Sequence, residues 1–137
     1  MNIYNLKTNY LMNPIGFLMD TVALSWIIEA PFEEELQGIR VLIALDENFE
    51  EVIHDNGMQA DLDPLCYQPE IKLQPRMRYF WKVIAKNVSG DESSSEIHYF
   101  ETAKEEELWT GKWIEPARQL QRMPLARKLF RLPAKPI

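Results

Sequence analysis

Cysteine, histidine and glycine are all scarce in this sequence of 137 residues, and each shortage excludes a class of chemistry. Cys66 is the only cysteine, so the chain can form neither an internal disulfide nor a cluster of thiolate metal ligands. The two histidines, His54 and His98, lack the i, i+4 spacing and the cysteine neighbours of a zinc site. None of the five glycines stands in a dinucleotide-binding or phosphate-binding loop. The sequence therefore predicts no metal and no cofactor.

Long hydrophobic runs are missing as well. No apolar stretch approaches the roughly 20 residues that a membrane-spanning helix needs. The start, MNIYNLKTNYL, has no basic segment followed by an apolar one, so it does not resemble a secretion signal. We therefore expect a cytoplasmic protein without a membrane partner.

Acidic residues are absent from the last part of the chain. Through Glu115 there are nine Lys or Arg residues against 21 Asp or Glu, whereas residues 116–137 contain six basic residues and no acidic one. A basic tail on an acidic body is a feature of nucleic-acid-binding arms. This tail lacks a groove-reading motif. We therefore favour the interpretation that it belongs to a different structural unit, and we expect no nucleic-acid partner.

What the sequence does contain is apolar residues that alternate with a period of two, which is typical of strands with one face in a core. The alternation is clearest in VALSWIIEA, in QGIRVLIALD and in RYFWKVIAK. Turn-forming segments such as NPIG, DNG and SGDESS separate these runs. We predict about seven short strands, near residues 3–10, 22–29, 37–46, 50–54, 69–73, 78–88 and 95–101. This spacing without long amphipathic helices indicates an all-β antiparallel sandwich.

The segment LQPRMRY, residues 73–79, refines that prediction. Leu-x-Pro-x-x-x-Tyr at the start of an alternating strand is the tyrosine-corner arrangement of fibronectin type III and immunoglobulin-like sandwiches, in which the tyrosine hydroxyl bonds to backbone a few residues upstream. We therefore assign Tyr79 and Trp81 to the core, together with Trp26 on an early strand.

Alternation places some apolar side chains on the opposite, outer face. Leu42 and Ala44 on one strand, and Phe80 and Ile84 on its neighbour, would form an apolar strip there. Isolated domains usually avoid such strips. We therefore expect another domain to pack on this face.

The order of motifs resembles the N-terminal region of bacterial α-L-rhamnosidases. The motifs are NPIGF (13–17), LSW (24–26), QGIRVLIA (37–44), IHDNG (53–57), YQPEIKLQPRMRYFWKV (67–83), FETA (100–103), WTGKWI (109–114) and LARKLF (125–130). The resemblance implies a fibronectin type III-like domain over residues 1–102. Residues 103–137 would be an irregular linker and, at LARKLF, the first strand of a following β-sandwich domain. Independently of the resemblance, Thr102 stands three residues before Glu105, a capping-box spacing that predicts one or two helical turns at TAKEEELW.

The same resemblance implies a function. The chain would be a non-catalytic accessory domain of a glycoside hydrolase that removes terminal α-L-rhamnose from glycosides, with inversion and without a redox cofactor. Its partners would be later domains of the same polypeptide. The candidate contact residues are Leu42, Phe80, Ile84, Trp109 and Trp113.

Carboxylates are plentiful, in runs at residues 33–35, 50–51 and 105–107. Glycoside hydrolysis needs two carboxyl groups about 5 to 9.5 Å apart. Nothing in the sequence selects such a pair, and solvated faces account for these runs. We therefore predict no catalytic residue in this chain.

An alternative function belongs to a different class. The chain could be a stand-alone module that binds carbohydrate or another partner, since exposed tryptophans such as Trp109 and Trp113 provide platforms for sugar rings. The sequence does not decide between a monomer and a homo-oligomer.

Overall fold

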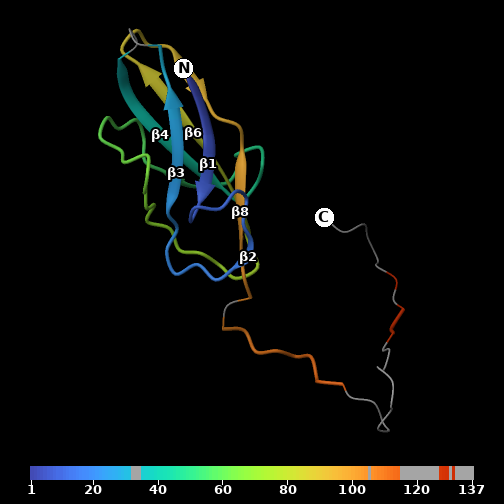
Figure 1. Cartoon of the computed structure of the whole chain (residues 1–137). Coiled ribbons are helices and arrows are strands. Elements are labelled where there is room, and N and C mark those ends of the chain that lie inside the picture. Colours follow the sequence, from blue (N-terminus) through green and yellow to red (C-terminus); the bar gives the residue numbers. More distant parts are fainter. Residues whose placement is uncertain (32–34, 105, 115–126, 130, 132–137) are drawn as a thin grey trace. The chain divides into compact units, whose positions relative to one another are not determined.

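A computed structural model describes residues 1–31, 35–104, 106–114, 127–129 and 131 (Figure 1). The chain divides into two compact units, Met1–Glu107 and Leu108–Ile137. All helices and strands found among the described residues lie in the first unit. They are β1 (Asn2–Thr8), β2 (Ile15–Phe17), β3 (Leu24–Glu29), β4 (Leu36–Ala44), β5 (Val52–Asp55), β6 (Arg78–Asn87), β7 (Glu92–Ser94) and β8 (His98–Thr102). Nowhere in the described part of the chain is there a helix capable of crossing a membrane.

The strands form two sheets that enclose one core. β1 and β3 pair antiparallel in a small sheet, which lies over a larger sheet of order β2-β8-β6-β4-β5, with β7 also paired to β6 (Figure 1). The largest fully buried side chains come from both sheets and include Trp26, Trp81, Tyr79, Phe100 and Leu6. The predicted all-β sandwich is therefore confirmed, and alternation places the core residues because period-two side chains point to one face.

The prediction of a strand at residues 69–73 is wrong. This stretch belongs to no sheet, and its Ile71 N–H donates to the Pro69 carbonyl at 3.0 Å. The small sheet has only a partial third member, which lies earlier in the chain. Leu24 and Tyr67 exchange both backbone hydrogen bonds, at 2.8 and 2.9 Å, and the Trp26 N–H donates to the Pro64 carbonyl at 3.0 Å. Prolines 64, 69 and 75 have no N–H to donate, which explains why regular pairing does not continue.

A three-residue strand was not predicted. β2 overlaps the NPIG segment at residues 13–16, which was interpreted only as a turn, and it pairs parallel to β8 through Ile15 with Glu101 and Phe17 with Thr102. The predicted last strand, residues 95–101, is observed only as β8, which begins at His98, and the short strand β7 before it was not predicted. Residues 95–97 separate the two strands, and there the Ser95 Oγ accepts from the Val83 N–H at 3.0 Å and donates to the Glu96 carbonyl at 2.7 Å.

The C-terminal part also differs from expectation. Residues 103–104 and 106–109 form no helix, and the Glu107 N–H donates to the Lys104 carbonyl at 3.5 Å in a single turn. Thr102, expected to cap a helical turn, instead donates its Oγ1 proton to the Gln74 carbonyl at 2.6 Å and accepts from the Met77 N–H at 3.0 Å. Half of the predicted strand at 125–130 falls outside the described residues, and residues 127–129 are not in a strand.

Candidate functional site

The tyrosine corner is present and well connected. The Gln74 N–H donates to the Tyr79 hydroxyl at 2.7 Å, five residues upstream as the sequence motif predicts. The Tyr79 ring stacks on Phe100 with centroids 5.1 Å apart and planes 20° apart. Because Thr102 binds Gln74 from the other side, the corner connects the loop before β6 to the end of β8. The contacts of Tyr79 therefore stabilise the core.

Trp26 and Trp81 occupy the centre of the same core. Both are fully buried, and Trp26 meets Tyr67 edge-on at 6.1 Å between ring centroids. The Tyr67 hydroxyl is hydrogen-bonded to Nε2 of His54 at 2.8 Å. Burial lowers the pKa of His54 and raises the pKa of Tyr67, which favours the neutral form of both. The pair therefore stabilises the structure without offering a reactive charge.

The predicted outer strip is largely covered by the chain itself. Leu42 has only 8% of its surface exposed and Ala44 none. Phe80 and Ile84, from β6, are half-buried. Long side chains on the same face supply the cover, because residues paired across strands share a face. The covering contacts are Lys82 Nζ 4.3 Å from the Phe49 ring centroid, Arg78 Cζ 4.8 Å from the Tyr99 ring centroid, and Phe80 against Tyr99 at 6.4 Å.

The second compact unit contains a very exposed apolar segment. Trp109 is 85% exposed and Trp113 is fully exposed. Their neighbours Leu108 and Ile114 are also largely exposed. Trp109, Gly111, Lys112 and Trp113 line an open hollow of about 450 Å³. Two tryptophans beside a cationic side chain can bind either an apolar protein surface or a sugar ring.

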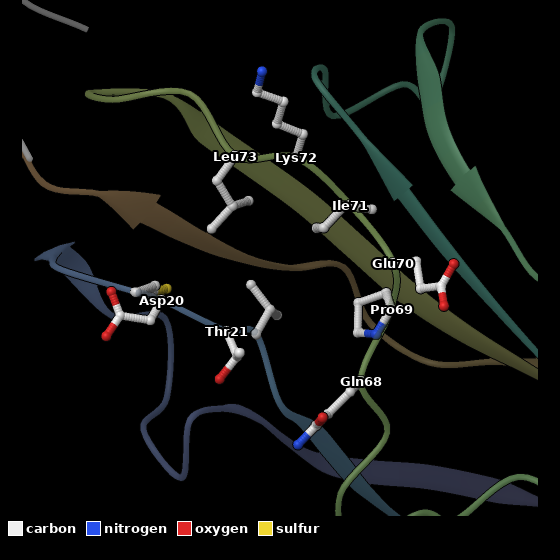
Figure 2. Close-up of a pocket in the computed structure, with 10 residues that line it drawn as sticks. Asp20, Thr21, Gln68, Pro69, Glu70, Ile71, Lys72 and Leu73 are labelled. Atoms are coloured by element: carbon white, nitrogen blue, oxygen red, sulfur yellow. The ribbon is translucent and has the colours of Figure 1, made fainter.

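A second hollow lies in the sandwich unit, where the third strand of the small sheet is lacking. Its volume is about 500 Å³, and it lies between the β2–β3 loop and residues 68–73. Figure 2 shows Asp20 and Thr21 on one wall, with Pro69 and Ile71 across from them and Lys72 pointing away. The lining lacks an aromatic side chain, so the hollow has no stacking platform for a sugar.

The charged groups of the sandwich make ion pairs and hydrogen bonds that stabilise the fold. Arg40 donates to both carboxylate oxygens of Asp55, at 2.8 and 2.5 Å. This hydrogen bonding lowers the pKa of Asp55 to about 2. Backbone N–H groups, that of Glu51 foremost, lower the pKa of Asp46. A general acid of glycoside hydrolysis needs the opposite shift. No group of His, Cys, Asp and Glu among the described residues could hold a metal ion.

Comparison with known proteins identifies the sandwich. Residues 3–106 match the family model described as "Rha78A-like, N-terminal immunoglobulin domain". An α-L-rhamnosidase of Formosa agariphila is 30% identical over 115 residues, which cover 77% of this chain and 12% of that protein.

Two solved structures have the same fold. The α-L-rhamnosidase of Streptomyces avermitilis, complexed with L-rhamnose, superposes with a TM-score of 0.66 at 24% identity, over 83% of this chain and 12% of that one. The α-L-rhamnosidase of Dictyoglumus thermophilum superposes with a TM-score of 0.62 at 22% identity, over 75% of this chain and 12% of that one. The chain thus spans about 12% of the length of these relatives. Since the family model covers most of the sequence, the chain belongs to the family of Rha78A-like N-terminal immunoglobulin domains.

Proposed function

We propose that this chain is the non-catalytic N-terminal accessory domain of a longer, bacterial and cytoplasmic α-L-rhamnosidase-like glycoside hydrolase. Other domains of that polypeptide would remove terminal α-L-rhamnose from glycosides. The observation that carries the proposal is the family match over residues 3–106, combined with relatives in which the matching region makes up 12% of the chain.

The chemistry of the described residues supports an accessory role. Asp46 and Asp55 have lowered pKa values, so they are poor candidates for a general acid at neutral pH. The buried polar side chains Tyr79 and Thr102 are used in backbone hydrogen bonds of the fold. The candidate contacts with later domains are Trp109 and Trp113, with the half-buried Phe80 and Ile84 as a second set, because large exposed apolar side chains are the usual anchors of an interface.

The proposal is tested by capturing the native protein from its source cells with antibodies against this chain. The captured material should hydrolyse p-nitrophenyl α-L-rhamnoside, whereas the purified 137-residue chain should not. The matched control is p-nitrophenyl β-D-glucoside, which should stay intact. Captured protein that leaves the rhamnoside intact would contradict the proposed parent activity.

Binding of carbohydrate by the chain itself is the second candidate function, and the exposed Trp109 and Trp113 favour it. Trp26 and Trp81 are buried, so a change in tryptophan fluorescence on adding L-rhamnose would come from the exposed pair. Binding predicts saturable quenching at millimolar sugar that Trp113→Ala removes. An unchanged spectrum in wild-type protein would eliminate this candidate and leave the accessory role unaffected.

A further inference from the structure

The segment that connects β1 to β3 is the most exposed apolar part of the sandwich unit. Residues 10–18, YLMNPIGFL, contain no charged side chain. Six large apolar residues in this segment are exposed by 43 to 73%: Tyr10, Leu11, Met12, Ile15, Phe17 and Leu18. We call this set the β2 surface.

The size of the β2 surface is unusual for an isolated domain. A large side chain offers on the order of 200 Å², so the six together expose on the order of 600 Å². The largest apolar patch on a typical monomer is about 300 to 600 Å² and often functional. All three residues of β2 are exposed, so none of its side chains is buried in the core. The strand is held to the larger sheet by its pairing with β8.

Specific hydrogen bonds anchor the segment in this exposed position. The Asn9 side chain donates to the Thr21 carbonyl at 3.1 Å and accepts from the Ala23 N–H at 2.7 Å. Asn13 Oδ1 accepts from the Tyr99 N–H at 3.0 Å. Asn9, Tyr10 and Asn13 all have positive φ, a conformation that asparagine adopts readily but that is costly for Tyr10. The fold therefore maintains backbone strain at Tyr10, in a segment that presents apolar side chains to the outside.

The β2 surface also lies where the chain leaves the sandwich. The Glu101 N–H donates to the Pro14 carbonyl at 2.9 Å, and the Ala103 N–H donates to the Phe17 carbonyl at 3.0 Å. Figure 1 shows β2 beside the end of β8. Whatever follows β8 in a longer polypeptide therefore begins next to Phe17, and this tether raises the effective concentration of a following domain at this surface.

We propose that the β2 surface is the docking site for an uncharged, apolar face of a domain that follows in the same polypeptide. This rests on the proposed function, because it needs a longer protein. It assigns the contact to residues that the sequence pattern did not single out, and it distinguishes them from the outer strip, where Phe49 and Lys82 already provide cover. A second copy of the chain is the rival occupant.

Thiol labelling tests the proposal in the native long polypeptide and in the 137-residue chain. Met12→Cys and Leu18→Cys are introduced separately into a Cys66→Ser background, because Cys66 is the only cysteine of this chain. Val88→Cys is the matched control, since Val88 is 58% exposed and lies outside the β2 surface. We expect a maleimide to react with the Met12→Cys and Leu18→Cys variants at least about tenfold more slowly in the long polypeptide than in the short chain. The Val88→Cys variant should react equally fast in both.

Each of the other possible outcomes would overturn the proposed docking site. Equal rates for Met12→Cys and Leu18→Cys in the two proteins, beside intact rhamnosidase activity of the long one, would overturn the docking site and leave the proposed function standing. Concentration-dependent protection in the short chain would overturn it in favour of a second copy. A native polypeptide of only 16.1 kDa would remove the occupant and overturn both proposals.

Discussion

Removing one oxygen atom from the core tests how the sandwich is held together. Tyr79→Phe deletes the hydroxyl that accepts the Gln74 N–H at 2.7 Å, while the ring and its stacking on Phe100 can stay in place. The loss should therefore come from the hydrogen bond, because no large cavity is created.

The size of the effect follows from what is left behind. The Gln74 N–H would lose its acceptor in a partly buried position, and an unsatisfied buried donor costs about 1 to 3 kcal/mol. We expect the lower half of that range, about 1 to 2 kcal/mol, because water has partial access. One kcal/mol lowers the melting temperature of a 60–100-residue domain by about 4 to 8 °C.

The assay is urea unfolding followed by fluorescence of the buried Trp26 and Trp81, with Thr102→Val as the partner variant. Thr102 bonds to the Gln74 carbonyl and to the Met77 N–H, so the two changes act on one loop and should not be additive. A loss below about 0.5 kcal/mol in Tyr79→Phe, the size of an ordinary surface substitution, would refute this reasoning.

Three further predictions concern charge and space. Gly38→Ala should destabilise by about 1 to 3 kcal/mol, because the added carbon would lie 2.9 Å from Met58 Cγ and 3.2 Å from the Gln59 carbonyl oxygen; Gly111→Ala, with nothing within 4 Å, is the neutral control. Asp55→Asn should cost only about 0.5 to 1 kcal/mol at neutral pH, since the pair with Arg40 is well exposed. The pKa of Asp55 is lowered from 3.8 to about 2, so this contribution is present above pH 3.8 and lost as pH falls toward 2; unfolding curves of wild type and variant that stay apart at pH 2 would contradict it. The pKa values of His54 and His98 are lowered by burial, so the free energy of unfolding should fall as pH drops below about 6.5. The double variant His54→Gln/His98→Gln should show a weaker dependence of this free energy on pH. A wild-type protein that becomes more stable toward pH 5 would exclude the mechanism.

Much of the fold could be predicted from local pattern. Period-two alternation located β3, β4 and β6, because alternate side chains of each strand point into the core, and the Leu-x-Pro-x-x-x-Tyr motif predicted the hydrogen bond at Tyr79. The strand at 69–73 was predicted wrongly because alternation counts side chains, whereas pairing needs backbone donors that prolines lack. β2 was missed because three residues are too few to show a period.

The exposed surfaces depend on contacts between distant segments, and local pattern does not report these. Lys82, the cross-strand partner of Leu42, lies against the Phe49 ring on the outer face, and Leu42 is buried although its strand position suggested exposure. Conversely, the sequence of residues 10–18 indicates only ordinary strand and turn, and the folded structure alone shows how many of their apolar side chains remain uncovered. Trp109 and Trp113, which the sequence analysis named as contact or platform residues, are both exposed in the structure.

The size of the native polypeptide tests the proposed function most directly. An immunoblot of the source cells with antibodies against this chain should show a band several times larger than 16.1 kDa, because the relatives are about eight times longer than the region they share with it, a ratio that follows from 12% coverage. A single band at 16.1 kDa would contradict the accessory role and leave sugar binding by Trp109 and Trp113 as the function to pursue.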